Sequence, residues 1–379
     1  MKKFVKTAVV AALGLSLLLT GCGSKSTSGD SAATINIGGN LEITGPVAQY
    51  GQNADKGIKM AVDEINAKGG ILGKQIKYIP ADNKSDAGES TGATTKLIAQ
   101  DKVVAILGPM TSGNTRAATQ VVTDNKVLLI TPTGTADNLT IDQPWIFRAC
   151  FNDSFQGQIA AAFAQDSLKA KTAALYVQKG DYSQGLAKSF KENFKGEIVF
   201  EGEYVAGDKD FKAVLTSMRA TNPDVVFIPG YYGEVGIIVK QARELGINAP
   251  MLGGDGWDDP SLVEIAGADK LNNTYMVSHA SLEDPALAKF VADFEAKYGA
   301  SPNPFAALGY DAAYMLFMAI EKAGEVDSEK IRQALENLGS FEGVSGTMNL
   351  DAATHNPIKS AVILEFKDGT PTFLSRVNP

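Results

Sequence analysis

The sequence predicts an α/β protein of two doubly wound parallel-sheet lobes. Short β-branched apolar runs alternate with helical periodicity along most of the chain, which is the pattern of buried parallel strands and their covering helices. The chain has 379 residues, more than one hydrophobic core usually supports. Near the C-terminus three helical patterns follow one another without a strand, so we expect them to cover a lobe that has already been built.

The first residues have the features of an export signal. Three lysines precede an apolar stretch, residues 7–19, that is too short to span a bilayer comfortably, and Leu19-Thr20-Gly21-Cys22 follows. This order resembles the lipobox of bacterial lipoproteins. We therefore predict a lipoprotein signal peptide over residues 1–21, lipidation of Cys22 and a flexible tether over residues 22–33. An uncleaved membrane anchor is the alternative.

Lobe 1 is predicted from an alternation of strand and helix patterns that begins at Thr34. The expected strands are short and apolar, and they cover residues 34–38, 74–79, 103–107, 127–130 and 145–149. Apolar residues recur at helical spacing over residues 47–68, 88–100 and 115–123. This alternation implies a parallel sheet with helices on both faces.

The same rhythm restarts after residue 152 and predicts lobe 2. Its expected strands cover residues 172–177, 197–205, 224–228, 251–253 and 274–278. Its expected helices cover residues 155–168, 182–194, 209–220 and 232–245.

The last third of the chain is predicted to return to both lobes. Helical patterns cover residues 285–298, 305–323 and 328–338, and a hairpin pattern follows at residues 361–366 and 372–376. We assign the helices to lobe 1 and the hairpin to lobe 2. The expected lobes are then residues 34–152 plus 282–355 and residues 153–281 plus 356–379. The chain would cross three times, near residues 152, 281 and 355, and a three-crossing hinge limits the lobes to opening and closing.

Two strand-to-helix loops of lobe 1 carry groups that suit a small anion. One contains Thr111, Ser112, Gly113 and Asn114, and the other is residues 133–137, TGTAD. Ligands of parallel sheets bind beyond the carboxyl ends of the strands, where these hydroxyls and the N–H groups of helix N-termini would converge. Neither loop contains a lysine, which argues against a nucleoside triphosphate, so a carboxylate fits best. Ordinary turn and cap chemistry is the alternative interpretation.

Charge and cysteine content narrow the possible partners. Removal of residues 1–21 takes away three lysines and no acidic residue, so the formal net charge goes from −8 to −11. Such a charge disfavours nucleic acid and anionic membrane surfaces. Cys22 is assigned to the lipid, so Cys150 has no intrachain partner and a disulfide framework is excluded.

The residues that could suggest an enzyme or a metal site lack the surrounding sequence that such a site requires. Gly88-Glu89-Ser90-Thr91-Gly92 matches G-x-S-x-G, but Ser90 falls in the first turns of an expected helix and not on a sharp turn after a strand. His279 and His355 are the only histidines and stand apart in the sequence, which excludes a histidine-rich zinc site. We therefore predict no enzyme, no metal and no cofactor.

A family resemblance is carried by residues 43–76, ITGPVAQYGQNADKGIKMAVDEINAKGGILGKQI. This stretch resembles the amino-acid-binding receptors of ABC importers, in particular the leucine/isoleucine/valine-binding proteins. ILGPMTSGNT, LLITPTGTADNLT, IPGYYGE and LGGDGWDDP follow in the family's order, so the resemblance covers residues 34–366. It implies a type I periplasmic-binding fold that closes over an amino acid.

The resemblance also implies roles for individual residues. Ser112 and Thr135 would bind the ligand carboxylate, Thr133 would offer its backbone carbonyl to the ammonium, and Asp255 would pair with the ammonium. Family members often have glutamate in place of Asp255, and Trp257 departs from the leucine-binding pattern, so the preferred side chain stays open. The other residues expected at the ligand are Tyr50, Met110, Tyr182, Tyr231 and Trp257.

The expected function is that of a substrate-binding lipoprotein of an ABC importer, on the extracytoplasmic face of the cell membrane. It would capture an aliphatic amino acid of the branched-chain type as a monomer and deliver it to the permease subunits. The alternative is a sensor or receptor for another small amide, a γ-amino acid or a short peptide on the same fold. For single residues, the alternatives are a turn role for Asp255 and a packing role for Trp257.

Overall fold

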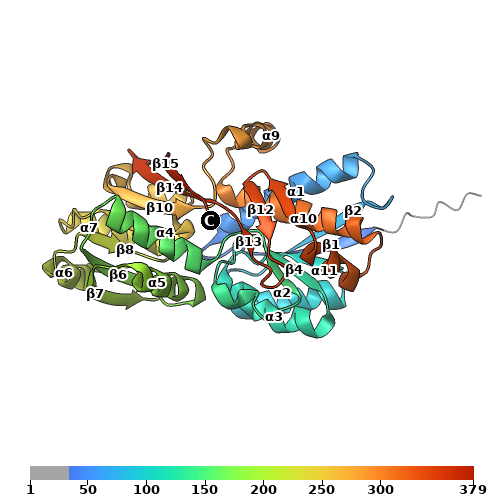
Figure 1. The fold of residues 1–379 in the computed structure, drawn as a ribbon, viewed down its shortest axis with the longest axis horizontal. Coiled ribbons are helices and arrows are strands. Elements are labelled where there is room, and N and C mark those ends of the chain that lie inside the picture. Colours follow the sequence, from blue (N-terminus) through green and yellow to red (C-terminus); the bar gives the residue numbers. More distant parts are fainter. Residues whose placement is uncertain (1–33) are drawn as a thin grey trace, which may run out of the picture. The chain divides into compact units, whose positions relative to one another are not determined.

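The structure is a computed structural model that describes residues 34–379. The predicted signal peptide, the tether and Cys22 lie outside the described residues. The described chain builds two large sheets with helices around them (Figure 1). We call the five-stranded sheet and its helices lobe 1, and the seven-stranded sheet and its helices lobe 2.

Lobe 1 contains the five strands that the sequence predicts. They are β1 (Ile35–Leu41), β2 (Ile76–Asp82), β3 (Ala105–Leu107), β4 (Leu128–Thr131) and β5 (Ile146–Arg148). All pairs are parallel, and the order in the sheet is β2-β1-β3-β4-β5. The strand order reverses direction between the neighbours β1 and β3, so the loops after these two strands lie side by side at one edge of the sheet.

Helices cover both faces of this sheet because alternate residues of its strands point to opposite sides. Ala105 and Leu107 pack with α1 (Ala48–Ala67) and α10 (Pro304–Ala323), whereas Ile106 packs with α2 (Ala87–Ala99) and α3 (Ser112–Asn125). The remaining elements are α11 (Ser328–Glu336), which packs near β4, and the short η1 (Asp137–Leu139). Of the late helices, α10 packs along α1.

Lobe 2 is built on a mixed sheet of order β15-β14-β10-β9-β8-β6-β7. Its parallel strands are β6 (Thr172–Gln178), β7 (Glu197–Tyr204), β8 (Val225–Phe227), β9 (Met251–Gly253) and β10 (Thr274–Ser278). The C-terminal hairpin adds β14 (Ala361–Lys367) and β15 (Thr370–Val377), both antiparallel. The hairpin therefore makes this sheet mixed, whereas a parallel sheet was expected.

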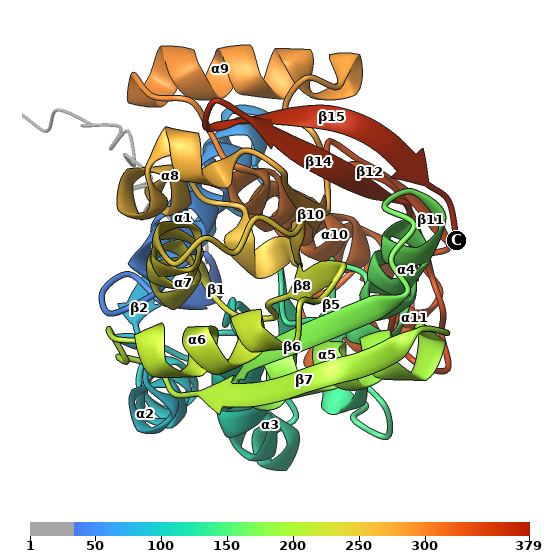
Figure 2. The same cartoon turned by 90° about the vertical axis from the view of Figure 1, so that its left-hand side faces the viewer.

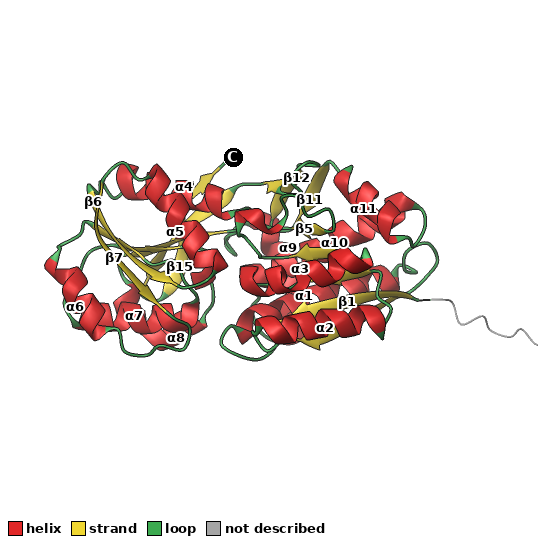
Figure 3. Ribbon diagram, turned by 90° about the horizontal axis from the view of Figure 1, so that it is seen from below, coloured by secondary structure: helices red, strands yellow, loops and turns green. Residues whose placement is uncertain are grey.

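The strands of lobe 2 lie between two groups of helices (Figure 3). On one face are α4 (Asp153–Asp166) and α5 (Asp181–Asn193), which pack against each other. The other face carries α6 (Lys212–Ala220), α7 (Tyr232–Glu244) and α8 (Ser261–Ala266), with η2 (Asp255–Trp257) and η3 (Ala268–Leu271) in the adjoining loops. Figure 2 shows α7 and α8 next to each other.

Three connections link the two lobes. The chain leaves β5 for α4, leaves β10 for η4 (Pro285–Leu287), α9 (Ala288–Tyr298) and α10, and returns to β14 after a small third sheet. This sheet consists of β11 (Ser340–Gly343), β12 (Gly346–Leu350) and β13 (Pro357–Ile358), which the sequence did not indicate.

No helix within residues 34–379 is long and apolar enough to cross a membrane.

Candidate functional site

The Asp255 carboxylate is the acidic centre of the site. Asp255 opens η2 directly after β9, and its side chain is 5% exposed. Its Oδ1 accepts hydrogen bonds from Gln156 Nε2 at 3.0 Å and from the Tyr182 hydroxyl at 2.8 Å, and its Oδ2 lies 2.9 Å from His279 Nε2. Within residues 34–379, His279 supplies the only ionisable nitrogen within 4.0 Å of this carboxylate. No lysine or arginine of the described chain therefore neutralises the acid directly.

Aromatic rings surround the space next to this acid. Tyr182 and Tyr231 stack with their ring centroids 5.2 Å apart, and Tyr50 meets Tyr231 edge-on at 5.9 Å and Phe305 at 4.5 Å. The Tyr50 hydroxyl donates to the Gly256 carbonyl at 2.5 Å, which joins α1 of lobe 1 to η2 of lobe 2. Burial raises the pKa of each of these tyrosines well above its usual range, so the phenols are neutral donors.

Glu42 organises the opposite side of the site from lobe 1. This residue is fully buried after β1, and its carboxylate accepts from the backbone N–H of Met110 and Thr111 at 3.0 and 3.1 Å. It also accepts from the Thr111 hydroxyl and from Asn114 Nδ2, at 2.9 and 2.8 Å. The Thr111 hydroxyl is thereby occupied and makes no cap bond to α3, which begins at Ser112. The first N–H groups of α3 are therefore left for another partner.

The predicted hydroxyl residues differ in what they already bind. Ser112 Oγ accepts from the Ala136 N–H at 3.1 Å, which leaves its own proton free to donate. The Thr133 hydroxyl donates to the Met110 carbonyl at 2.6 Å and ties the two loops together. Thr135 Oγ1 is buried without a hydrogen-bond partner among the described residues.

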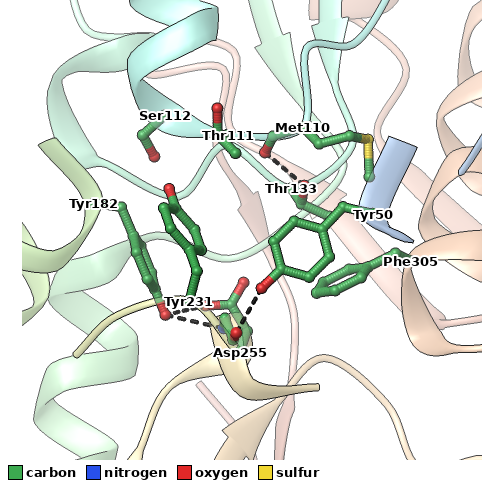
Figure 4. A pocket seen from close by; sticks show the side chains of 10 residues that line it. Tyr50, Met110, Thr111, Ser112, Thr133, Tyr182, Tyr231, Asp255 and Phe305 are labelled. Atoms are coloured by element: carbon green, nitrogen blue, oxygen red, sulfur yellow. Dashed lines mark hydrogen bonds between the residues drawn. The ribbon is translucent and has the colours of Figure 1, made fainter. Parts of the chain in front are cut away.

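These groups line a small cavity. In Figure 4, Ser112 and Thr111 lie at one end, Asp255 lies at the other, and the tyrosine rings stand between them. The residues that line the cavity are Tyr50, Met110, Thr111, Ser112, Thr133, Tyr182, Tyr231, Asp255, Gly256 and Phe305.

Two of the predicted site residues do not line this cavity. Trp257 is fully buried, and its indole N–H donates to the Ile228 carbonyl at 3.0 Å in lobe 2. Its ring packs on Gly253, where an added Cβ would lie 2.0 Å from the indole. Trp257 is therefore packed inside lobe 2 and is not among the residues that line the cavity. Thr135 is not among the lining residues, and its carbonyl accepts from the Asp153 N–H at 2.9 Å.

Several residues of the site were not predicted. Gly256 and Phe305 line the cavity, and Glu42 and Gln156 hold its two ends. Thr111, which also lines the cavity, belongs to the loop predicted to suit an anion, although it was not assigned a ligand contact of its own. Gln156 contacts Asp255 across 99 positions of sequence, and no local pattern indicates such a contact.

The described residues offer no arrangement for catalysis or metal binding. They contain no group of three His, Cys, Asp or Glu side chains placed to hold a metal ion. The Ser90 hydroxyl donates to the Asn114 carbonyl at 2.9 Å, and His355 is bound to the Ile146 carbonyl at 3.0 Å. Burial raises the pKa of the Cys150 thiol to about 12, which removes it as a nucleophile near neutral pH. The site thus has an acid, Asp255, at one end and the Ser112 hydroxyl at the other.

Comparisons with known proteins place the chain in a family. Residues 34–371 match the family model described as periplasmic binding protein. The chain is 33% identical to the leucine-, isoleucine-, valine-, threonine- and alanine-binding protein of Pseudomonas aeruginosa over 84% of this chain and 86% of that protein.

Two solved structures are similar over nearly the whole described chain. One is the branched-chain amino acid transporter substrate binding protein LivJ from Streptococcus pneumoniae in complex with isoleucine, at 42% identity and a TM-score of 0.88, covering 92% of this chain and 100% of that one. The other is the leucine binding protein LivK from Thermotoga maritima, at 34% identity and a TM-score of 0.87, covering 91% and 99%. The chain therefore belongs to the periplasmic binding protein family and is a substrate-binding protein, not an enzyme.

Proposed function

We propose that this protein captures an aliphatic, branched-chain amino acid between its two lobes and delivers it to the permease of an ABC importer. The observation that carries this proposal is the position of Asp255, a buried acid with no lysine or arginine partner among the described residues, at one end of a small cavity. The related proteins named above bind such amino acids or work in their transport, which supports the same ligand class.

The charges of an amino acid match the two ends of the cavity. Burying an unpaired charge costs several kcal/mol, so a zwitterion requires a donor set for its carboxylate and an acceptor for its ammonium. The Ser112 hydroxyl and the first N–H groups of α3 are available as donors. Asp255, together with the Thr133 carbonyl, would accept from the ammonium. The ligand's two charged groups would therefore be held by opposite lobes.

The middle of the cavity suits an apolar side chain. Met110, Phe305 and the faces of Tyr50 and Tyr231 line it. Large polar side chains would have no partner there. The cavity therefore favours aliphatic amino acids over sugars or peptides.

Closure of the lobes would bring the two ends of the cavity onto the same ligand. The Tyr50–Gly256 hydrogen bond and the ion pair between Arg116 and Asp181, 2.6 Å apart, already join lobe 1 to lobe 2. We propose lobe boundaries at the predicted crossings near residues 152, 281 and 355, which would act as the hinge. A ligand can favour the closed state only by as much as it binds that state better, so contacts from both lobes are the mechanism.

The N-terminal sequence supports an anchored receptor. Cleavage before Cys22 and lipidation of its thiol would hold the protein on the extracytoplasmic face of the membrane, with residues 22–33 as a tether. We propose a monomer, because a single chain contributes both ends of the cavity.

Isothermal titration calorimetry of the purified protein against the twenty amino acids tests the proposed ligand class. We expect leucine, isoleucine or valine to bind with a Kd of about 1 µM or less. Asp255→Asn should weaken that binding by about 2 to 5 kcal/mol, because the ammonium loses its buried counter-charge. Asp258→Asn is the matched control, since Asp258 is a neighbouring buried acid that does not line the cavity. No heat from any amino acid, or equal effects of the two substitutions, would contradict the proposal.

A further inference from the structure

His279 has a geometry that links it to Asp255. Its Nε2 lies 2.9 Å from Asp255 Oδ2, and its ring is 1% exposed. An ionised carboxylate only accepts hydrogen bonds, so Nε2 carries the proton in the neutral imidazole. The lone pair then lies on Nδ1, which is buried and has no hydrogen-bond partner among the described residues. A second proton would have to bind at this unpartnered nitrogen.

Two of the lobe connections hold the His279 ring. His279 follows β10 directly, and its ring stacks on Phe151, which lies between β5 and α4, with the centroids 3.9 Å apart. The stacking on Phe151 therefore holds the imidazole between two of the lobe connections, while its Nε2 contacts Asp255 in the site. Rotation of the ring away from Asp255 would break this stacking.

Four charged or titratable side chains lie near His279 or near its partner Asp255. Asp255 faces it from η2 and favours a proton on it, whereas Lys359 faces it from the segment before β14 and opposes one. Asp258 lies beyond the Ser278 hydroxyl that donates to it, and burial raises the pKa of Asp258 to about 7. Asp153 of α4 lies close enough for Asp255 to raise its pKa further.

Burial is the strongest influence on His279 itself. It lowers the pKa of the imidazole below its usual value, and the attraction of Asp255 only partly opposes this. Lys359 is also buried, and burial lowers its pKa to about 8, so its positive charge is retained near neutral pH. His279 is therefore neutral at pH 7 and takes up a proton only below the usual pKa of an imidazole.

We propose that His279 is a positioning residue for Asp255, and that a proton on its imidazole competes with the ligand's ammonium for the same carboxylate. This inference rests on the proposed function. In its neutral form His279 orients the carboxylate by donating one hydrogen bond. In its charged form it already supplies the cation that the ligand would otherwise bring. Acid would thus release the ligand through this one residue.

The sign of the pH dependence follows from proton linkage. A bound ammonium repels a second cation, so the ligand lowers the pKa of His279 below its value in the free protein. Binding then releases one proton wherever the pH lies between these two values. The affinity is constant near neutral pH and falls as the pH drops through the free-protein pKa, by at most about tenfold per pH unit for one proton.

Calorimetry with leucine from about pH 8 to pH 5 tests this dependence in four proteins. The wild type should lose affinity in acid, and His279→Gln should bind within about threefold of the wild type at neutral pH without that loss, because its amide donates but does not titrate. His279→Leu should bind more weakly at every pH. Asp258→Asn should keep the wild-type profile. If Asp258→Asn abolishes the acid effect while His279→Gln retains it, the inference is wrong.

Nuclear magnetic resonance of the imidazoles gives a second test that needs no substitution at His279. The chain has two histidines, so His355→Gln assigns both signals. We expect leucine to lower the pKa of His279 and to leave that of His355 unchanged. Equal His279 titration curves with and without bound ligand would overturn the inference and leave the proposed function standing.

Failure of the proposed function would be seen separately. If no amino acid binds at neutral pH, the ligand assignment is wrong, but the coupling can still be measured in the free protein. Asp255→Asn should then lower the pKa of His279, because the carboxylate is the group that favours the proton. An unchanged value would show that the two side chains are not coupled.

Discussion

The acids of the site differ in how their charge is compensated, although all are buried. Glu42 accepts four hydrogen bonds, two of them from backbone N–H groups, so its charge is balanced within lobe 1. Asp255 accepts from Gln156, Tyr182 and His279, and no lysine or arginine of the described chain pairs with it. Residue type and burial alone would not distinguish these two acids. Their hydrogen-bond partners assign a structural role to one and a binding role to the other.

Asp258 provides a stability prediction for a single residue. Burial raises its pKa from 3.8 to about 7, so the folded protein binds more protons than the unfolded chain between these values. The protonated acid therefore contributes stability at low pH that is lost as the pH rises toward about 7. Asn cannot ionise, and its amide oxygen can still accept from Ser278. The stability of Asp258→Asn relative to the wild type should increase by about 2 to 3 kcal/mol between about pH 5 and pH 8. Urea unfolding at several pH values measures this, and a constant difference would contradict it.

Single residues also show where sequence reasoning stops. Ser112 and Thr133 could be predicted because they lie in the loops that follow β3 and β4, where ligands of parallel sheets bind, whereas Asp255 was assigned through the family resemblance. Gln156 and Phe305 could not be predicted, because they reach the site from the helices α4 and α10 and not from a strand end. The choice between packing and ligand contact for Trp257 could not be made from the sequence, because the room that Gly253 leaves for the indole is visible only in three dimensions.

At the scale of secondary structure, length and periodicity decided what could be predicted. The strands of both large sheets and the long helices follow clear apolar patterns, and the structure contains them with shifts of a few residues at their ends. The six-residue helix α8 and the strands β11, β12 and β13 carry too few buried residues for a period to be visible. The helix α3 starts at Ser112, three residues before the expected start, because Glu42 fixes the preceding loop.

The contact between α1 and α10 sets the position of two site residues, and it depends on glycine. A Cβ on Gly57 of α1 would lie 2.0 Å from the Ala306 carbonyl oxygen of α10. Tyr50 and Phe305, whose rings meet at 4.5 Å, lie on these same two helices. The close approach of α1 and α10 therefore sets the positions of two aromatic rings in the cavity wall.

Gly57→Ala should separate these helices and destabilise the protein by about 1 to 3 kcal/mol, since backbone must move to admit the methyl group. Gly92→Ala on α2 is the matched control, because a Cβ there meets no atom within 4 Å. That substitution should stabilise by up to about 1 kcal/mol through helix propensity. Thermal unfolding of the two variants compares them. Similar stabilisation by both would mean that the helices have room for a side chain at Gly57.

At the scale of the whole described chain, function depends on contacts that join the two lobes. The Tyr50 hydroxyl reaches the Gly256 carbonyl from within the cavity, whereas the Arg116–Asp181 ion pair is 40% exposed on both sides. Exposed ion pairs contribute little, and buried hydrogen bonds contribute more when a partner would be left unsatisfied. The alternation of strands and helices predicted the two sheets, but it contained no information on these contacts between them.

Tyr50→Phe tests the buried contact between the lobes. The ring and its packing remain, but the Gly256 carbonyl loses its donor, so leucine binding should weaken by about 1 to 2 kcal/mol. Arg116→Ala should weaken binding by less, and its small effect should diminish in high salt. Calorimetry of both variants at two salt concentrations gives the comparison. A larger effect of Arg116→Ala would place the main closing contact at the surface and not in the cavity.

The central claim is that opposite lobes hold opposite charges of one ligand. It is tested most directly by calorimetric titration with leucine, with leucinamide, which lacks the carboxylate, and with 4-methylpentanoate, which lacks the ammonium. The account predicts that leucine binds and that each analogue loses at least about 2 kcal/mol, because a buried group at one end of the cavity is left without its partner. If either analogue binds as tightly as leucine, the cavity does not recognise both charges and the account is wrong.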